Sequence, residues 1–213
     1  MRIVLMGAPG SGKATQAKQL ERTLGIPRIA TGSLLRAAAA AGTAPGQQAR
    51  QALDAGHLVP DDVVLELIRE RLREPDAAGG FVLEGFPRSV AQAQAFDTLL
   101  AELRTPLDRV IQIDMPEDEL RPRLLGRRVC SDCGAVFHAE SRPPRESGTC
   151  DVCGGELVRR RDDSQDAVER RLATYAEHAP GLLDYYAQRG LLYHVNGTRD
   201  SELVYDEIRA LLS

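Results

Sequence analysis

The stretch IVLMGAPGSGKAT, residues 3–15, decides the fold. Its four apolar residues predict a buried strand, its glycines predict a tight turn, and a helical pattern continues to Leu24. Three glycines allow the turn to point backbone N–H groups inward, where the positive end of the helix dipole lies. The spacing matches a P-loop up to Lys13, whose charge would meet the outer phosphates of a nucleotide.

The residue after the lysine departs from the general P-loop motif. The motif places Ser or Thr there to bind magnesium, whereas this chain has Ala14 and carries Thr15 one position later. We therefore expect other groups to hold most of the magnesium. A glycine-rich turn without a ligand is the alternative, but only Lys13 and Lys18 among the 27 basic residues are lysines. Retaining a lysine in the loop favours a point charge at this position.

Length and composition limit the class of protein. The chain has 213 residues, of which 43% are apolar and 27% charged, which is ordinary for a globular protein with one core and an insertion or two. A net charge of −4 argues against nucleic acid as the main partner. No apolar run reaches the length of a membrane span, and Met1 leads directly into the first strand. We expect a cytoplasmic protein without a membrane partner.

Further strands and helices alternate along the chain. Strands are predicted at 26–30, 80–84, 108–114 and 191–195, and helices at 31–41, 45–54, 61–72, 89–100, 116–125, 165–186 and 200–212. Thr31-Gly32-Ser33 is expected to cap its helix. This alternation predicts a parallel, doubly wound α/β fold. The helices near residues 30–59 carry few large apolar side chains, so this segment is expected to move.

Four cysteines lie in a polar segment, residues 126–163, that lacks helical periodicity and is interpreted as an inserted small domain. They form two C-x-x-C pairs, each followed by glycine: Cys130 with Cys133, and Cys150 with Cys153. This spacing is typical of a four-thiolate zinc site, which would be structural because all four ligands are protein groups. Disulfides or a redox pair are the alternatives.

Charged side chains gather at the ends of the predicted elements. Glu84 ends the strand at 80–84, where the carboxyl end of a parallel strand adjoins the ligand crevice. The arginines concerned are Arg36, Arg88, Arg123, Arg127, Arg160 and Arg171. Each alone is typical of a solvated surface, but together with a P-loop they indicate a cleft for more phosphate than one triphosphate presents. Phosphoryl transfer also requires exclusion of water, for which mobile segments would serve as lids.

Several motifs together resemble the adenylate kinase family in its bacterial form with a zinc-containing lid, and the resemblance covers the whole chain. They are Gly7-Ala8-Pro9-Gly10-x-Gly12-Lys13, Thr31-Gly32-x-Leu34-Leu35-Arg36, Gly85-Phe86-Pro87-Arg88, Gln92-Ala93, Gly126-Arg127-Arg128, Asp162-Asp163 and Arg171-Leu172. The resemblance implies a P-loop NTPase-type parallel sheet flanked by helices. It further implies a core domain (1–29, 60–125 and 164–213), a small helical NMP-binding domain (30–59) and a zinc-binding lid (126–163).

The resemblance also implies roles for individual residues. ATP would be bound by Gly10, Ser11, Gly12, Lys13, Ala14, Thr15, Arg127, Val136, Phe137 and Arg199. AMP would be bound by Thr31, Arg36, His57, Leu58, Val59, Gly85, Phe86, Pro87, Arg88, Gln92, Arg160 and Arg171. The catalytic set would be Lys13, Glu84, Arg88, Arg123, Arg127, Arg160 and Arg171. The implied reaction moves the terminal phosphoryl group of MgATP to AMP, giving two ADP, in a protein that carries structural zinc. We expect a monomer, because the sequence leaves no long apolar face unassigned.

Three positions depart from the family pattern: Ala14 replaces Gly, Ser33 replaces Asp, and Glu84 replaces Asp. Alanine tolerates helical dihedrals, whereas the extra methylene of Glu84 moves a carboxylate expected to order the water around magnesium. We expect activity that is reduced or altered in metal preference. Two alternatives stay open. One is a kinase for UMP or CMP, although the Gln92 amide can pair with the edge of adenine and so favours AMP. The other is a zinc-bearing P-loop binding module with weakened catalysis.

Overall fold

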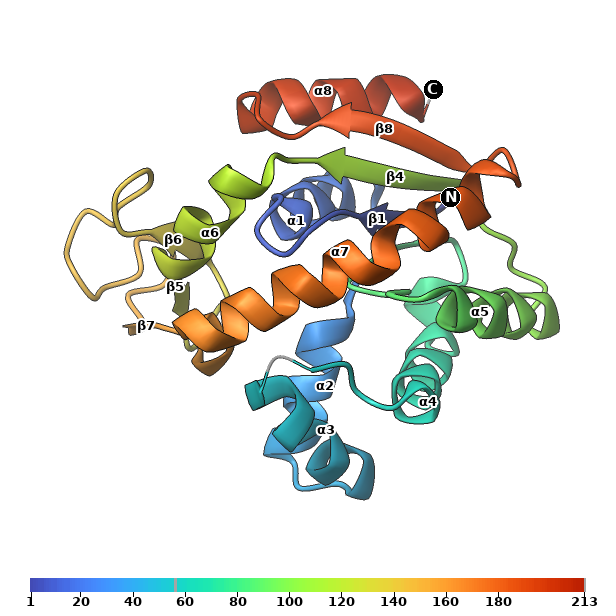
Figure 1. Ribbon diagram of the computed structural model, residues 1–213, viewed down its shortest axis with the longest axis horizontal. Coiled ribbons are helices and arrows are strands. Elements are labelled where there is room, and N and C mark those ends of the chain that lie inside the picture. Colours follow the sequence, from blue (N-terminus) through green and yellow to red (C-terminus); the bar gives the residue numbers. More distant parts are fainter. Residues whose placement is uncertain (56, 213) are drawn as a thin grey trace.

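A computed structural model describes residues 1–55 and 57–212. Its centre is a five-stranded parallel sheet (Figure 1) in the order β2-β3-β1-β4-β8. The strands are β2 (Arg28–Ala30), β3 (Phe81–Glu84), β1 (Arg2–Met6), β4 (Arg109–Asp114) and β8 (Leu192–Asn196). Because all five run in one direction, the residues that follow β1, β3 and β4 meet at a single edge of the sheet. The predicted parallel α/β fold is confirmed.

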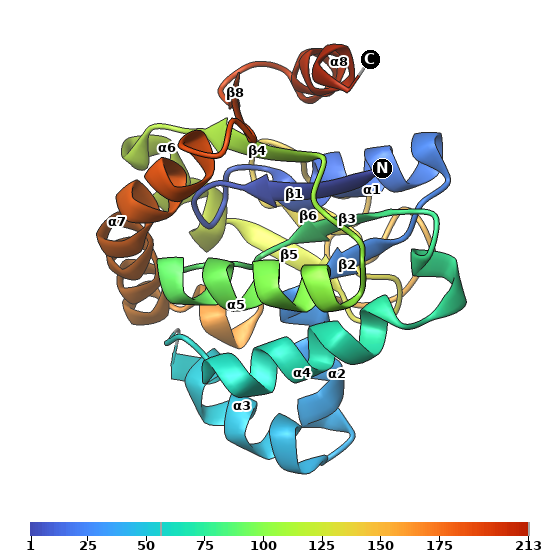
Figure 2. The ribbon, with the colours of Figure 1, turned by 90° about the vertical axis from the view of Figure 1, so that its right-hand side faces the viewer.

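Helices cover both faces of the sheet (Figure 2), which explains why its strands are apolar runs. Ile3 and Leu5 of β1 are buried against α1 (Lys13–Leu24) and α8 (Ser201–Leu211). Val4 and Met6 alternate to the opposite face, where the core includes residues of α4 (Asp61–Leu72), α5 (Val90–Glu102) and α7 (Gln165–Ala187). The phosphate-loop segment therefore starts from a strand that is fixed on both sides.

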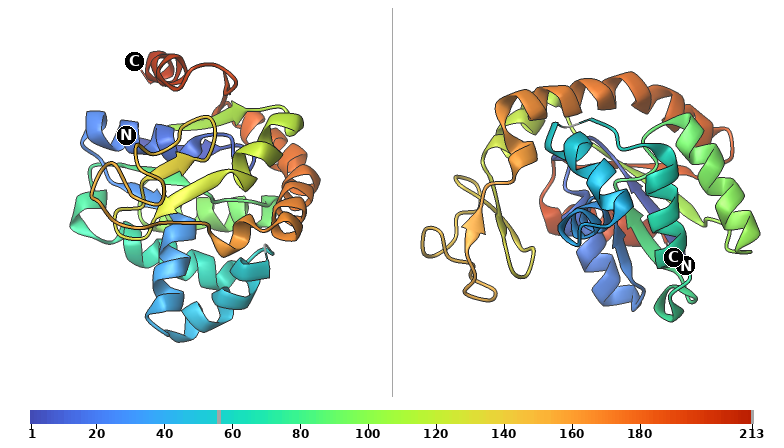
Figure 3. Two further views of the ribbon diagram at one scale, coloured as in Figure 1. Left: turned by 90° about the vertical axis from the view of Figure 1, so that its left-hand side faces the viewer. Right: turned by 90° about the horizontal axis from the view of Figure 1, so that it is seen from below.

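Two segments project from this core (Figure 3). One contains α2 (Thr31–Ala40) and α3 (Ala44–Ala55), which pack so closely that a Cβ at Gly46 would lie 2.0 Å from the Ala38 carbonyl oxygen. The other follows α6 (Glu117–Leu125) and contains β5 (Arg127–Cys130), β6 (Val136–His138) and β7 (Leu157–Val158). These strands form an antiparallel sheet in the order β6-β5-β7.

Some local expectations need correction. The segment 126–163 contains regular strands that its sequence did not reveal, because strands of two to four residues are too short for alternation to be recognised. Thr31 lies inside α2 and not at its cap: the N-cap is Ala30, and no side chain caps this helix among the described residues. Two single-turn helices, η1 (Pro75–Ala77) and η2 (Arg161–Asp163), were also not predicted. None of the described helices is long and apolar enough to cross a membrane.

Candidate active site

The loop between β1 and α1 has the backbone geometry of an anion site. Gly7, Gly10 and Gly12 have φ values of 142°, 91° and 98°, a region that favours glycine. A side chain at Gly7 would also place its Cβ 2.7 Å from the Ile113 carbonyl oxygen. Because α1 begins at Lys13, the backbone N–H groups of Lys13 and Ala14 have no partner within the helix and are available to phosphate, whereas that of Thr15 donates to the Gly12 carbonyl oxygen at 3.0 Å. Ala14 fits this turn, since it lies within α1.

Lys13 is held back against its own loop. Its Nζ donates to the carbonyl oxygens of Gly7 and Ala8, each at 2.7 Å, and approaches the Ser11 hydroxyl at 3.4 Å. Burial is the main cause that lowers the pKa of Lys13 to about 7, and neighbouring Arg88 lowers it further while Glu84 opposes the change. An anion beside Nζ would favour the protonated amine and restore the charge.

A cavity of about 910 Å³ opens beside this loop. It is of the size that small-molecule sites occupy in proteins. The predicted site residues that line it are Gly10, Ser11, Gly12, Lys13, Ala14, Thr15, Arg36, His57, Leu58, Glu84, Gly85, Phe86, Pro87, Arg88, Arg123, Arg127, Val136, Phe137, Arg160, Arg171 and Arg199. The structure thus brings together segments from both projecting parts and from the core.

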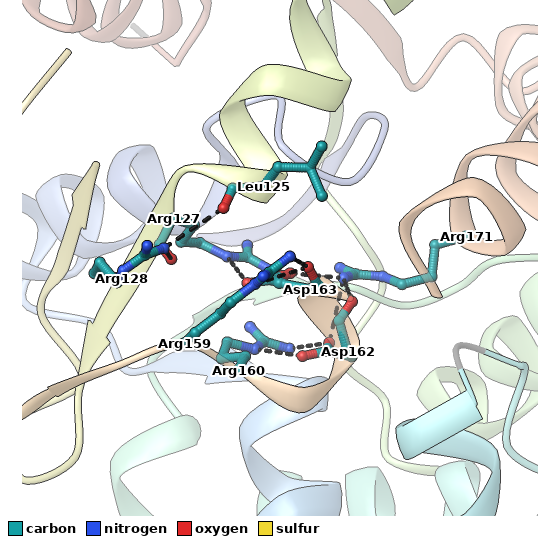
Figure 4. A network of polar contacts seen from close by, with 8 residues as sticks. All are labelled: Leu125, Arg127, Arg128, Arg159, Arg160, Asp162, Asp163 and Arg171. Carbon is teal, nitrogen blue, oxygen red and sulfur yellow. Dashed lines mark hydrogen bonds and ion pairs between the residues drawn. The ribbon is translucent and has the colours of Figure 1, made fainter. Parts of the chain in front are cut away.

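Three of the predicted arginines lie in one network with two aspartates (Figure 4). Arg127 Nε donates to Asp163 Oδ2 at 2.8 Å, although the two residues lie at opposite ends of the 126–163 segment. Arg171 Nη1 donates to the Asp162 carbonyl oxygen at 2.8 Å and lies 3.2 Å from Asp163 Oδ1. Arg160 Nε donates to Asp162 Oδ1 at 2.8 Å. The carboxylates join the two ends of the segment and hold the guanidinium groups around the cavity.

Burial of this network changes its ionisation. Asp163 is 0% exposed, and the Arg171 side chain is 13% exposed. Burial lowers the pKa of Arg171 to about 10, an effect that Asp162 opposes. For Asp162, burial acts to raise the pKa, but Arg160 and Arg171 outweigh it and hold the pKa below its usual range. With a pKa of about 10, Arg171 remains charged near neutral pH and can form charge-assisted hydrogen bonds to phosphate.

The other predicted arginines lie outside this network, and each contacts one nearby residue. Arg88 Nε donates to the Gly85 carbonyl oxygen at 2.8 Å, and Arg36 Nη2 lies 3.4 Å from Ser33 Oγ. Arg123 pairs with Glu119 at 2.9 Å one helical turn away. Burial lowers the pKa of Arg36 to about 10 and also lowers the pKa of Arg88. Arg199 pairs with Glu207 at 3.1 Å.

Glu84 has a partner that the sequence did not indicate. Ala30 and Glu84 are in register on neighbouring strands, so Arg28, two residues earlier on β2, projects from the same face of the sheet. Arg28 Nε donates to Glu84 Oε1 at 2.8 Å, and its Nη2 contacts the same oxygen. Both residues line the large cavity. Both contacts use Oε1, so Arg28 ties the Glu84 carboxylate to the edge strand β2 through one oxygen.

A second, smaller cavity of about 20 Å³ adjoins the large one and shares Phe86 and Arg88 with it. The remaining predicted residues, Thr31, Val59 and Gln92, line this smaller cavity. Thr31 Oγ1 is buried and has no hydrogen-bond partner among the described residues. A buried hydroxyl without a partner is costly, so this atom is a candidate contact for a polar ligand group.

The four cysteine sulfurs all lie within 4.8 Å of one another, and none of the cysteines is in a disulfide. The Sγ atoms of Cys130 and Cys153 are 3.4 Å apart, close to the roughly 3.8 Å between ligands of a tetrahedral zinc–thiolate site. Gly134 and Gly154 have φ values of 67° and 77°, so each pair turns back through a left-handed residue, as its glycine predicts. This donor set fits zinc.

Sequence reasoning missed two groups beside the site, Arg28 and Asp61. Arg28 interrupts a strand predicted from apolar residues, and its partner depends on strand register, which the sequence did not supply. Asp61 was interpreted only as the start of a helix, but its Oδ1 accepts from Gln92 Nε2 at 2.6 Å. An acid in a helical first turn is too common to indicate this role.

The fold and cavity define a nucleotide-binding phosphotransferase of the P-loop class. Residues 5–191 match the family model described as adenylate kinase. One relative named adenylate kinase, from Archaeoglobus fulgidus, is 47% identical over 100% of this chain and 98% of its own length. Another, from Geobacillus sp., is 49% identical over 100% of this chain and 98% of its own length. A third, from Thermodesulfovibrio yellowstonii, is 48% identical over 100% of this chain and 99% of its own length. The chain belongs to the adenylate kinase family.

Proposed function

We propose that the chain transfers the terminal phosphoryl group of MgATP to AMP, reversibly, and releases two ADP. One observation carries this reaction: the phosphate loop lines a large cavity and Thr31 and Gln92 line a smaller one that adjoins it. Arg36, Arg160 and Arg171 line the large cavity, and Arg88 lines both. A loop that binds a triphosphate needs no second pocket, whereas transfer between two nucleotides does. The family to which the chain belongs supports the same reaction.

The donor site consists of the loop residues Gly10 to Thr15. Backbone amides hold the phosphates, and Lys13 leaves the carbonyl oxygens of Gly7 and Ala8 to meet them. We place the adenosine of ATP against Arg127, Val136, Phe137 and Arg199, which line the same cavity. Magnesium bound with ATP neutralises phosphate charge, and the Glu84 carboxylate is a hard oxygen donor that fits it, directly or through water.

The acceptor site lies across the cavity. Arg36 and Arg88 bind the phosphate of AMP, while Thr31, Val59 and Gln92 surround its nucleoside together with the backbone of His57 and Leu58. An oxygen of this phosphate attacks the terminal phosphorus of ATP, and the bond to the bridging oxygen breaks, so that ADP leaves with the electron pair. Arg123, Arg127, Arg160 and Arg171 stabilise the charge that spreads over the transferring group.

We further propose three domains: a core (1–29, 60–125 and 164–213), an NMP-binding domain (30–59) and a lid (126–163). The lid holds structural zinc through Cys130, Cys133, Cys150 and Cys153, and the metal supplies the folding energy that its small apolar cluster lacks. The protein acts as a cytoplasmic monomer whose partners are ATP, AMP and ADP. Closure of the two smaller domains excludes water during transfer.

ADP formation from ATP and magnesium, with AMP, UMP, CMP or no acceptor, tests the proposal. We expect product with AMP and background rates with the other acceptors. Product with UMP or CMP at equal rate would favour the kinase for a pyrimidine nucleotide. If the folded, zinc-loaded protein forms no product with any acceptor, the proposal fails, and the chain is better described as a zinc-bearing binding module.

A further inference from the structure

Gln92 is a buried amide whose two ends are already engaged. It is 2% exposed and lines the small cavity of the acceptor site. Its Oε1 accepts from the backbone N–H of Arg88 at 2.8 Å, and its Nε2 donates to Asp61 Oδ1 at 2.6 Å. Its backbone N–H in turn donates to Ser89 Oγ at 3.2 Å, where Ser89 caps α5. The side chain is thus fixed at both ends by groups from separate segments.

These partners determine which way round the amide lies. The backbone N–H of Arg88 is a donor only, so it requires the carbonyl oxygen of Gln92. The Asp61 carboxylate is an acceptor, so it requires the NH₂ group. Turning the amide over would set oxygen against oxygen at Asp61 and N–H against N–H at Arg88. Gln92 therefore has one N–H and one carbonyl lone pair left for a ligand, in a fixed order.

A fixed order of donor and acceptor distinguishes two classes of purine. A 6-aminopurine presents a ring-nitrogen acceptor beside an amino donor, which an amide can match with two hydrogen bonds. A 6-oxopurine presents a ring N–H beside a carbonyl oxygen at the same edge, so the amide would have to turn over. A site with buried polar groups rejects a ligand that leaves them unpaired or opposed.

We propose that Asp61 is a specificity-determining, positioning residue, which locks the Gln92 amide so that the acceptor site takes 6-aminopurine monophosphates and rejects 6-oxopurine ones. Asp61 acts through Gln92 and touches no reacting atom. It is the first residue of α4, whereas Gln92 belongs to α5, so the selection depends on the packing of these two helices. The inference rests on the proposed function, since it takes AMP as the acceptor.

The test compares AMP with IMP, which differ at the purine edge in question. In the unaltered protein we expect kcat/KM to favour AMP strongly. Asp61→Asn offers an amide that can donate or accept, so Gln92 can turn and one of the two opposed contacts disappears. We expect the AMP-to-IMP ratio of kcat/KM to fall on the order of tenfold or more, chiefly through the KM for IMP.

The control is Asp62→Asn, which removes the same charge from the next residue of the same helical turn, also exposed. Its ratio should equal that of the unaltered protein. Calorimetric binding of AMP and IMP without ATP provides a readout that does not need turnover, and thermal unfolding checks that both variants fold. If Asp61→Asn unfolds, Asp61→Ala is measured in its place, with the same expected direction, because it also frees the amide.

The outcomes separate this inference from the proposed function. If the unaltered protein does not phosphorylate AMP, the proposed function fails. If it prefers AMP and a folded Asp61 variant keeps the same AMP-to-IMP ratio in turnover and binding, the positioning role of Asp61 is wrong. An equal fall of the ratio in Asp62→Asn would also overturn the inference, because the effect would then follow charge at the helix terminus and not the contact with Gln92.

Discussion

The phosphate loop and the arginine network are built in different ways. The loop is local: residues 7–13 take their shape from glycines and from the adjoining β1 and α1. The network joins residues that are far apart in the sequence: Arg127 contacts Asp163 across the whole segment 126–163, and Arg171 of α7 also contacts Asp163. The loop is formed by backbone before a ligand arrives, whereas the arginines are held by aspartates that phosphate must compete with. Binding of the donor and transfer to the acceptor should therefore respond to different changes.

Removal of the zinc proposed for the lid should separate the two regions most strongly. Metal binding is worth about 10 kcal/mol to a small zinc-dependent segment, so a chelator or Cys130→Ser should unfold the lid. The loop should keep its structure, because the adjoining β1 and α1 pack in the core. Hydrogen exchange with and without chelator measures both regions at once. Ser131→Ala, an exposed neighbour, is the control, and equal protection of residues 126–163 with and without metal would contradict the structural role.

Lys13→Ala tests the loop alone. Loss of the charge aimed at the outer phosphates should lower kcat/KM by about 10³-fold, as for other preorganised charge contacts. The melting temperature should change little, because the burial that lowers the pKa of Lys13 opposes the gain from its bonds to the Gly7 and Ala8 carbonyl oxygens. Steady-state kinetics and thermal unfolding measure the two effects. The exposed Lys18→Ala is the matched control, and an equal loss in both variants would remove the special role of Lys13.

Arg171→Lys tests the network alone. The charge stays, but the planar group that contacts both Asp162 and Asp163 is lost. We expect kcat to fall about 100-fold, while the affinity for MgATP, measured by calorimetry, changes little. Arg170→Lys, at an exposed neighbouring position on α7, should have no such effect on kcat. A parallel loss of MgATP affinity would mean that the two regions are not independent.

The pH dependence of nucleotide binding sharpens the comparison further. The pKa of Lys13 is about 7 in the free protein, and bound phosphate raises it, so binding takes up a proton above pH 7. The affinity for nucleotide should be highest below pH 7. Above pH 7 it should fall by up to about tenfold per pH unit, until the pH reaches the pKa of Lys13 in the complex. Calorimetry at pH 8 in two buffers of different ionisation enthalpy measures the uptake. Lys13→Ala should abolish it.

The smallest effect is expected at Glu84. Glu84→Asp shortens the side chain that Arg28 holds, so the carboxylate should lose its contact with Arg28 on the edge strand β2. We expect about a threefold change in the magnesium concentration that gives the half-maximal rate, with little loss of stability. Arg28→Gln should shift the same quantity by a similar factor. An unchanged rate and unchanged magnesium dependence in Glu84→Asp would contradict a role for the longer side chain.

The difference between local and distant construction also explains what the sequence could predict. Residues 3–15 specify strand, turn and helix within one short segment, and the cysteine pairs specify their own turns through Gly134 and Gly154. Both were predicted from spacing. The partners Arg28 of Glu84 and Asp61 of Gln92 were not, because each depends on register or on packing between elements far apart in the chain.

The arginines fall between these extremes. Their positions at element ends predicted a phosphate-binding cleft, and the structure places all of them along one cavity. Asp162-Asp163 was one of the motifs of the family resemblance, but its contacts with Arg127, Arg160 and Arg171 follow from the fold of η2 and not from any local pattern. A single-turn helix after two-residue β7 leaves no periodicity to recognise.

The central claim is direct transfer between two nucleotides in a shielded cavity. The most direct test uses ATP labelled with ³²P in its terminal phosphate, together with magnesium and equal concentrations of AMP and UMP. It measures which product carries the label. We predict that the label appears in ADP, with little in inorganic phosphate or UDP. Label found chiefly in inorganic phosphate would mean that water reaches the loop and that no acceptor site operates, and label found chiefly in UDP would mean that the acceptor pocket is not built for adenine.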